Sequence, residues 1–439
     1  MVFSYRAERV TCKASGGKRT VRRESTVETA TGSARGKPAS TALMLLVGLL
    51  FVGNALNYVD RQVLALLKPT LEAEFHWSDA QYAHLGSSFQ IAAAAALLFV
   101  GWFVDRLGVR VAYAIAVTVW SAAGMAHALA QTVQQFVIAR IVLAAGESVS
   151  TPAGLKAAAV FMPPRERNIA IGLVNAAPNI GAILTPLLIP PFALAFGWKA
   201  AFFVTGSLGF VWLIAWIAGT RNLRPVGNIP ERTRVNWGVL LGDRRTWAVI
   251  GVKALTDCVW WFVLFWMPDY FNRAFGLGQA RLGWPIAIIF TLAALGAVTS
   301  GALFPILRSR GLSVNAARKS SMLFYALVVL AMPLALLAQS PWIAAMLIGL
   351  GLFAHQGFST NIFAMTTDVI PATRVASVIA LGAVAGNLSG AGIIEFAGWS
   401  LKHGHGYAPM FLICGSAYLA ALAFLQVMLP KLEMADSVE

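Results

Sequence analysis

Two ionisable side chains of opposite sign, Asp60 and Arg61, are adjacent within the apolar segment LNYVDRQVL of residues 56–64. A second pair, Arg140 and Glu147, is spaced seven residues apart, which is two helical turns and places both on nearly the same face. A buried guanidinium stays ionised and binds a carboxylate through two parallel hydrogen bonds. A carboxyl group in a poorly hydrated site takes up a proton more readily, and a neighbouring arginine opposes that uptake. These residue types together favour anion binding coupled to proton transfer.

The composition of the chain places these charges in a membrane. Hydrophobic residues make up 58% of the 439 residues and charged residues only 12%, whereas soluble domains contain about 25% charged residues. Apolar segments of about 20 residues, each long enough to cross a bilayer as a helix, recur along the chain. They predict twelve transmembrane helices, at residues 41–66, 80–103, 110–131, 134–160, 167–193, 198–219, 246–271, 281–306, 320–338, 342–365, 375–400 and 407–430.

The basic residues follow the topology of these helices. If the N-terminus is cytoplasmic, 25 of the 34 Lys and Arg residues fall on the cytoplasmic side, five on the outer side and four within spans. This asymmetry predicts that both termini are cytoplasmic. It also argues against a nucleic-acid partner in spite of the net charge of +15, because a nucleic-acid-binding protein gathers its basic residues on one soluble surface.

The predicted helices divide into two groups of six. We expect a disordered basic cytoplasmic tail over residues 1–40, an N-terminal six-helix half over 41–219 and a C-terminal six-helix half over 246–430. A polar, basic loop at 220–245 separates the halves, and residues 431–439 form a second cytoplasmic tail. The sequence contains no Gly-rich phosphate loop and no metal-spaced His/Cys cluster, so it predicts neither an enzyme nor a resident cofactor or metal.

A short motif, GWFVDRLGVR, follows the second predicted helix at residues 101–110. Its glycines are expected to let helix ends approach closely, its carboxylate to meet a helix N-terminus, and its arginines to anchor at the inner leaflet. The loop after the eighth predicted helix, GALFPILRSRG, carries a related signal without the acid. We expect the first motif to form a cytoplasmic gate, composed of Gly101, Asp105, Arg106, Gly108 and Arg110.

The spacing G-x-x-x-D-R-x-G-x-R and the six-plus-six plan resemble the major facilitator superfamily, whose halves rock about a site at the bilayer midplane. Longer segments, among them NYVDRQVL, ARIVLAAGESVSTPAGLKAAAVFMPPRERNIAIGLV and LTDCVWWFVLFWMPDYF, resemble its anion:cation symporter branch, most closely the bacterial hexuronate transporters. The likeness extends from about residue 42 to residue 433. It implies an all-α membrane protein with twelve transmembrane helices in two six-helix halves and both termini in the cytoplasm.

Ionisable residues inside a membrane are usually functional, and the resemblance implies roles for those of the first and fourth helices. We expect Arg61 to bind the carboxylate of a sugar acid and Tyr58 to contact the same substrate. Asp60 and Glu147 would carry protons, and Arg140 would tune them. The alternative is that these charges form structural pairs, Asp60 with Arg61 and Arg140 with Glu147, that hold the two helices in register.

Neutral polar side chains at mid-helix are candidates for contacts with the hydroxyl groups of such a substrate. We place Gln356 and Asn387 in the binding site, with Trp260 stacking on the sugar ring and Asn57 on the polar face of the first helix. Interhelical hydrogen bonding is the alternative for residues of this kind. His355 is expected to be a hydrogen-bonded core residue rather than a proton carrier.

Other buried charges have simpler interpretations. Lys253 and Asp257 are four residues apart and favour an intrahelical ion pair. Lys156 is expected either to reach the interface or to stabilise an inner gate. Glu395 has no evident partner in the sequence. Ala93 stands where related transporters often carry Tyr, which predicts either closer helix packing or a larger cavity.

The sequence therefore predicts a secondary active transporter that imports a hexuronate-like organic monoanion by proton symport. Its partners would be the small anion, protons and the lipid bilayer, and we expect a monomer in the bacterial inner membrane. An exporter or antiporter of the same fold is an alternative, because a fold does not set the direction of transport. A membrane sensor of sugar acids that transports nothing is a further alternative.

Overall fold

The computed structural model describes residues 41–226 and 236–432, so the expected tail at 1–40 and most of that at 431–439 lie outside the described residues. Within these two ranges twelve helices are long and apolar enough to cross a membrane, which confirms the twelve predicted spans. The same ranges contain helices and no strands. The expected linker at 220–245 is described only in part, and it includes a short helix, α9 (Trp237–Gly242).

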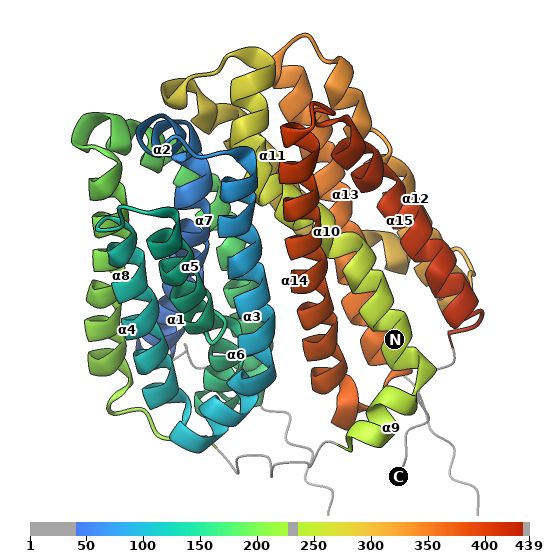
Figure 1. Cartoon of the computed structure of the whole chain (residues 1–439). Coiled ribbons are helices and arrows are strands. Elements are labelled where there is room, and N and C mark those ends of the chain that lie inside the picture. The colour runs from blue at the N-terminus through green and yellow to red at the C-terminus, as the bar shows by residue number, and fades with distance from the viewer. Residues whose placement is uncertain (1–40, 227–235, 433–439) are drawn as a thin grey trace, which may run out of the picture. The chain divides into compact units, whose positions relative to one another are not determined.

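The first six spans occupy one side of the view in Figure 1. A short helix, α2, follows the first of them and marks one end of the helix group. The elements are α1 (Thr41–Leu66), α2 (Lys68–Phe75), α3 (Asp79–Leu107), α4 (Val109–His127), α5 (Val133–Glu147), α6 (Ser150–Phe161), α7 (Pro164–Phe196) and α8 (Trp198–Thr220).

The second six spans occupy the other side of that view. The ninth span continues beyond its α-helix as a short 3₁₀ helix, η1, which begins next to Pro333. The elements are α10 (Arg244–Phe275), α11 (Gln279–Ser309), α12 (Val314–Val329), η1 (Met332–Leu337), α13 (Pro341–Val369), α14 (Ala372–Lys402) and α15 (Ala408–Met428).

The fourth span is interrupted where the sequence alone suggests one continuous helix. α5 ends at Glu147 and α6 begins at Ser150. Pro152 explains the break, because it lacks a backbone N–H and its ring clashes with the carbonyl four residues earlier. Glu147 therefore stands at a helix end, with a backbone carbonyl that can accept a hydrogen bond from another helix.

The two halves meet closely at the end of the bundle that carries α2, here called the α2 face. A Cβ atom added to Gly398 of α14 would come within 3.0 Å of the Ala83 side chain of α3. One added to Gly283 of α11 would come within 3.0 Å of the Pro186 carbonyl of α7. Only glycine allows backbones this close, so the helices of the two halves pack tightly at this face.

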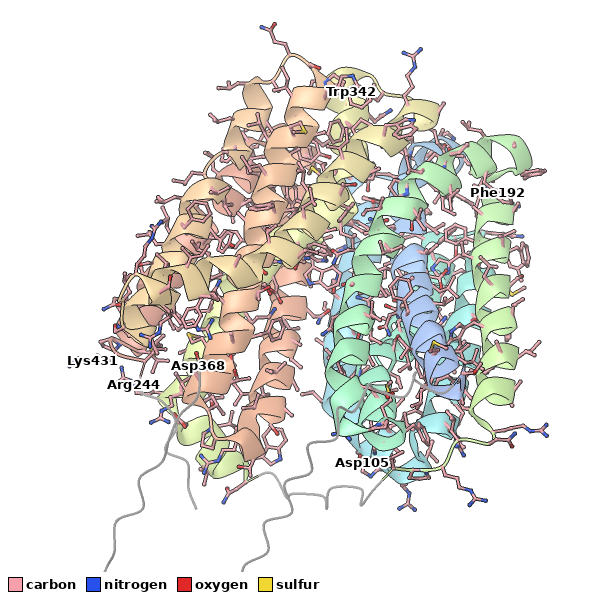
Figure 2. The ribbon with its side chains drawn as sticks, turned by 180° about the vertical axis from the view of Figure 1, so that it is seen from behind. Asp105, Phe192, Arg244, Trp342, Asp368 and Lys431 are labelled. Atoms are coloured by element: carbon pink, nitrogen blue, oxygen red, sulfur yellow. The ribbon has the colours of Figure 1, made fainter. Side chains whose placement is uncertain are left out.

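At the opposite end, where α1 begins and α15 ends, the halves diverge; we call this end the terminal face. A Cβ added to Gly101 of α3 or Gly301 of α11 would meet no atom within 4 Å. Figure 2 shows Asp105 and Asp368, one from each half, at this end. Among the described residues, every hydrogen bond and ion pair that joins the two six-helix halves lies at the α2 face or midway along the bundle. The structure is therefore closed at the α2 face and open toward the terminal face.

Candidate functional site

The polar side chains of α1 point toward two different partners. Asn54 accepts hydrogen bonds from the hydroxyls of Ser150 and Thr151 in α6. Asn57 donates to the backbone carbonyl of Glu147 at 3.2 Å, using the acceptor that the break between α5 and α6 leaves available. Asn57 is 3% exposed, so its amide holds Glu147 in place rather than lining an open surface in this conformation.

Arg61 and Glu147 form the central ion pair of the site. The Arg61 Nε atom lies 2.8 Å from Glu147 Oε2, and the side chains are 14% and 0% exposed. The other guanidinium N–H groups of Arg61 have no protein acceptor among the described residues. They are therefore available to a second anion. Glu147 Oε1 is buried and has no hydrogen-bond partner in the described parts of the chain.

Three aromatic rings surround the Arg61 guanidinium. Its Cζ atom lies 5.2 Å from the ring centre of Tyr58, 5.4 Å from that of Phe89 and 5.7 Å from that of Trp261. A guanidinium over aromatic faces is stabilised as a cation without being neutralised. Phe89 and Trp261 thus hold the arginine in position. Phe89 was not anticipated from the sequence, because an isolated aromatic residue in an apolar helix gives no distinguishing signal.

Asp60 and Arg140 lie in the same region but form no ion pair. Asp60 is 5% exposed and lies beside the Thr205 hydroxyl of α8, and it interacts electrostatically with Glu147 and Arg140. Arg140 lies 4.8 Å from the ring centre of Phe89. Its Nε and Nη1 atoms are buried and lack a hydrogen-bond partner within residues 41–226 and 236–432.

The charge pairing differs from both structural pairs considered from the sequence. Asp60 and Arg61 are adjacent and point to different neighbours, and Arg140 does not bond Glu147. The observed pair, Arg61 with Glu147, joins α1 to α5 instead. Neighbouring residues on a helix diverge by about 100°, so Asp60 faces α8 while Arg61 faces α5.

On the C-terminal side of the site, Trp260 lies between Tyr58 and His355. The Tyr58 and Trp260 ring centres are 6.4 Å apart and edge to face, and Trp260 stacks on His355 at 5.5 Å. The His355 Nδ1 atom is 2.5 Å from the Tyr418 hydroxyl. His355 is 5% exposed, which confirms the prediction of a hydrogen-bonded core residue.

A polar contact between the halves lies next to this aromatic group. The Gln356 side chain of α13 donates to Asn179 of α7 at 3.4 Å. On α7, Asn175 is one turn before Asn179 and is exposed. Asn387 of α14 is partly buried and donates to the Ala383 carbonyl of its own helix at 2.8 Å, which leaves its amide oxygen available.

Lys253 and Asp257 form the predicted intrahelical ion pair on α10, with Nζ to Oδ2 at 2.7 Å. The Asp257 carboxylate packs against Gly386 of α14, where a larger residue would collide with it. This places Asn387, the next residue of α14, beside the Lys253–Asp257 pair. The pair thus borders the polar part of the site without contacting Arg61.

The GWFVDRLGVR motif lies at the terminal face, and some of its expected contacts differ. Asp105 bonds Lys156 of α6 at 2.5 Å, at the end of the bundle where the gate is expected. The Arg110 guanidinium turns inward, 4.8 Å from the Phe161 ring centre, and donates to the Leu223 carbonyl. It does so because α4 starts against the ends of α6 and α8, so Arg110 is not a leaflet anchor here.

The two glycines of the motif make no close helix contact in this conformation. A Cβ at either Gly101 or Gly108 would meet no atom within 4 Å. Gly108 has a φ of 75°, a left-handed conformation that favours glycine, and it separates α3 from α4. Gly101 and Arg106 are exposed. The expected close approach at Gly101 is absent because the two halves diverge at this end.

A buried cluster of charges joins the halves at the α2 face. Lys68, whose side chain is 1% exposed, bonds Asp269 of α10, Glu72 at 3.0 Å and Asp79 at 3.3 Å. Arg273 of α10 bonds Asp79 and lies 2.9 Å from Asp269. Two cations and three carboxylates thus bridge α2 and α3 of one half and α10 of the other, so separation of the halves leaves Lys68 with two carboxylates in the N-terminal half and Arg273 with Asp269 in the C-terminal half.

Tyr407 adds a hydrogen bond within the C-terminal half, and Glu395 adds contacts between the halves. The Tyr407 hydroxyl donates to Asp269, and burial together with the Asp269 charge raises the pKa of Tyr407 well above its ordinary value. Glu395 of α14 has partners in α3, because it lies 2.6 Å from His84 Nδ1 and accepts a hydrogen bond from Ser87. No spacing rule links these positions, so a partner for Glu395 could not be predicted from the sequence.

The position of Ala93 favours close packing over an enlarged cavity. Ala93 is 3% exposed, and its backbone carbonyl accepts a hydrogen bond from Ser148 at 3.5 Å. Ser148 lies in the interruption between α5 and α6. The small side chain therefore lets α3 approach the interrupted segment of the fourth span beside Glu147.

Two solved structures share this fold. The D-xylose-proton symporter superposes with a TM-score of 0.71 at 16% identity, covering 89% of this chain and 99% of that one. A bacterial homologue of the human lysosomal transporter Spinster, in an inward-facing and unoccupied conformation, has a TM-score of 0.69 at 17% identity, over 89% of this chain and 96% of that one. Both structures thus share the helical fold of this chain.

The family model of the Major Facilitator Superfamily matches residues 50–394, and the chain belongs to that superfamily. The hexuronate transporter of Escherichia coli strain K12 is 26% identical over 387 residues, which cover 84% of this chain and 89% of that protein. The galacturonate transporter of Dickeya chrysanthemi is 26% identical over 291 residues, which cover 62% and 83%. The protein is thus a multi-pass transporter of the inner membrane.

Proposed function

We propose that this transporter imports a monoanionic sugar acid together with protons by alternating access. The observation that carries the proposal is the Arg61–Glu147 pair, a partly exposed guanidinium that a single buried carboxylate holds at 2.8 Å. The similarity to hexuronate and galacturonate transporters supports a sugar acid as the substrate. A D-galactonate transporter of Escherichia coli, 25% identical over 417 residues, extends the candidates to aldonates.

In the proposed cycle, the substrate carboxylate and the Glu147 carboxylate compete for Arg61. The substrate binds the free N–H groups of the guanidinium in the two-pronged geometry that arginine favours. Glu147 then loses part of its attraction to Arg61, and a buried carboxylate without its cation takes up a proton. Release of the substrate lets Arg61 return to Glu147, which expels the proton.

The rest of the substrate is proposed to contact both halves. Tyr58 and Trp260 supply an apolar wall against which a sugar ring can pack, 6.4 Å apart between ring centres. Gln356 and Asn387 supply amide groups for the hydroxyls, and Gln356 exchanges its contact with Asn179 for one with the substrate. Because these residues come from both halves, a bound substrate favours closure of the halves around it.

Charge balance favours more than one proton per substrate. Bringing a monoanion into a cell that is negative inside costs about 2.3 kcal/mol per 100 mV of membrane potential. One proton cancels that cost, and a second makes the membrane potential drive accumulation. Glu147 and Asp60 are the two buried acids of the first and fourth spans, and both are candidates for this purpose.

Transport assays in proteoliposomes test the proposed direction and coupling. With labelled glucuronate, galacturonate and galactonate, we expect uptake to rise when the outside is acidic and to fall when the gradient is collapsed. Uptake that is driven by an acidic interior would instead establish antiport. Uptake indifferent to the gradient would exclude proton coupling, while counterflow with none of these acids would exclude the substrate class.

For alternating access, the ion cluster at the α2 face must open while the terminal face closes around Gly101. Replacing Lys68 by Met removes the buried cation and leaves Asp269 and Asp79 with one fewer positive partner. Removing one member of a buried ion pair costs about 3–5 kcal/mol, enough to shift a two-state equilibrium about 100-fold or more. We therefore expect Lys68→Met to populate a form that is open at the α2 face.

Spin labels at the exposed residues Ala73 and Ala280, in a background with Cys12 replaced by Ser, report this opening as a longer interspin distance. Cys258 and Cys414 are buried and do not compete for labelling. Lys402→Met removes an exposed lysine near the same face and serves as the matched control. Distances that are unchanged in Lys68→Met relative to this control would show that the cluster does not hold the halves together.

A further inference from the structure

A pocket at the terminal face of the C-terminal half is lined by cations from helices far apart in sequence. It has a volume of about 310 Å³ and lies where α10 begins and where α13 and α15 end. Arg244, Arg245 and Lys431 line it together with apolar residues, and no acidic side chain lines it. Figure 2 shows Arg244 and Lys431 next to each other at this end of the molecule. The pocket is outside the transport site.

The positive charge of the pocket is only partly used by the protein. Arg244 donates to the Val427 carbonyl at 3.2 Å and Arg245 to the Val369 carbonyl at 3.0 Å. These hydrogen bonds satisfy backbone carbonyls at the C-terminal ends of α15 and α13, and each uses one terminal nitrogen of a guanidinium. Across residues 41–226 and 236–432, Arg244, Arg245 and Lys431 make no salt bridge with a carboxylate. Several N–H donors and three positive charges are therefore available to an anion.

Within the described residues, two acids lie next to pocket-lining positions in sequence, and both have other partners. Asp243 accepts a hydrogen bond from the backbone N–H of Arg245 at 2.9 Å and so caps α10. Asp368 lies 2.9 Å from Arg318 Nε and is neutralised by it. Neither acid lines the pocket. The local charge excess is thus built into the fold and is not compensated by the residues that the structure describes.

A second, apolar groove begins beside this pocket. It has a volume of about 430 Å³ and runs between α12 and α15, lined by Leu323, Leu419 and Leu422 among others. Lys319 joins the two spaces, because its Nζ atom bonds Gln426 of the groove and the Leu429 and Pro430 carbonyls of the pocket, each at 2.7 Å. A positively charged site therefore continues into a channel suited to hydrocarbon.

The depth of the pocket matches the membrane interface. Trp237 and Leu241 of α9 and Trp247 of α10 are 54%, 42% and 49% exposed. The Trp247 indole donates to the Leu241 carbonyl at 2.7 Å, so α9 lies against the start of α10. Exposed Trp residues at the end of a transmembrane helix mark the level of the lipid headgroups. Phosphate groups of the bilayer lie at this level.

We propose that this pocket and groove together bind one anionic phospholipid, with its phosphate on Arg244, Arg245 and Lys431 and an acyl chain along α12 and α15. Basic pockets between transmembrane helices are suited to anionic headgroups. Guanidinium groups bind phosphate oxygens through paired hydrogen bonds. The lipid would tie α10, α12 and α15 together at the face where the halves separate.

Native mass spectrometry of the delipidated full-length protein tests the proposal. With phosphatidylglycerol and phosphatidylcholine of identical chains, we expect one tightly bound phosphatidylglycerol and at least tenfold weaker binding of phosphatidylcholine. The double variant Arg244→Gln with Lys431→Gln should weaken the binding of phosphatidylglycerol about 30-fold, because each basic group near an anionic lipid surface contributes about a fivefold effect. Equal binding of the two lipids would overturn the proposal.

Three further arms separate the alternatives. The matched control, Arg221→Gln with Arg224→Gln, removes two exposed arginines of the N-terminal half and should leave binding unchanged. Ala423→Trp fills the groove and leaves the basic residues of the pocket in place, and it should weaken the binding of phosphatidylglycerol. If millimolar glycerol phosphate displaces bound phosphatidylglycerol as strongly as unlabelled lipid does, the pocket is a site for soluble phosphates and the proposal is overturned. Lipid binding that appears only after removal of residues 433–439 would also overturn the proposal, because it would mean that these acidic residues occupy the pocket in the full-length chain.

Discussion

Replacing Arg61 by Lys is expected to raise the Kd for a sugar acid about 10- to 100-fold. A hydrogen bond to a charged group contributes about 1.5–3 kcal/mol, and each 1.4 kcal/mol corresponds to a factor of ten in Kd. An ammonium group retains the charge but cannot form the two parallel bonds of a guanidinium. Lysine would also lose the packing of the planar group between the rings of Tyr58, Phe89 and Trp261.

Displacement of a labelled sugar acid from the purified protein measures this Kd. The chain offers a matched control in Arg318→Lys, because Arg318 Nε lies 2.9 Å from Asp368 and is 11% exposed, close to the geometry of Arg61. That pair lies at the terminal face, and its substitution should leave the Kd within about twofold of wild type. An Arg61→Lys variant with wild-type affinity would contradict the proposed grip on the substrate carboxylate.

Replacing Glu147 by Gln is expected to abolish accumulation driven by a proton gradient and to spare exchange of labelled for unlabelled substrate. Gln keeps the size of Glu and can still accept a hydrogen bond from Arg61, but it cannot take up a proton. Exchange returns the carrier with substrate bound, so it requires no proton release. We expect gradient-driven accumulation to fall at least tenfold and exchange to stay within about threefold of wild type.

Both activities are measured in the same proteoliposomes, so the ratio of gradient-driven accumulation to exchange does not depend on the amount of protein inserted. Asp368→Asn is the control, because it makes the same change from acid to amide in an Arg–carboxylate pair at the terminal face. Accumulation that survives in Glu147→Gln but fails in Asp60→Asn would move the proton role to Asp60. Loss of both accumulation and exchange in Glu147→Gln would assign a structural role to Glu147.

The fold could be predicted from the sequence because its signals are local. A run of about 20 apolar residues is sufficient to identify a span, and the twelve predicted spans are present with ends shifted by a few residues. The exception is the fourth span, where Pro152 divides one apolar run into α5 and α6. The proline is evident in the sequence. Whether it interrupts the helix depends on whether neighbouring side chains form hydrogen bonds with the backbone groups that lose their helical partners, and the sequence does not show this.

The members of the site could be chosen from the sequence, but their pairing could not. Arg61, Asp60, Arg140 and Glu147 were selected because buried charges are rare, and the structure gathers them in one region. Which carboxylate binds which arginine depends on helix rotation, and a turn of about 100° per residue separates Asp60 from Arg61. Contacts between distant helices, such as Lys68 with Asp269, carry no spacing signal at all.

The interruption between α5 and α6 gives the fourth span two short helical segments. α5 is bonded to α1 through Arg61 and Asn57, both at Glu147. α6 is bonded to α1 through Asn54 and to α3 through the Lys156–Asp105 pair. Pro152 leaves the backbone hydrogen-bond ladder incomplete between the two segments, so a change in the tilt of α5 is only weakly transmitted to α6. The fourth span can thus bend at the level of the Arg61–Glu147 pair without a change in the Lys156–Asp105 pair.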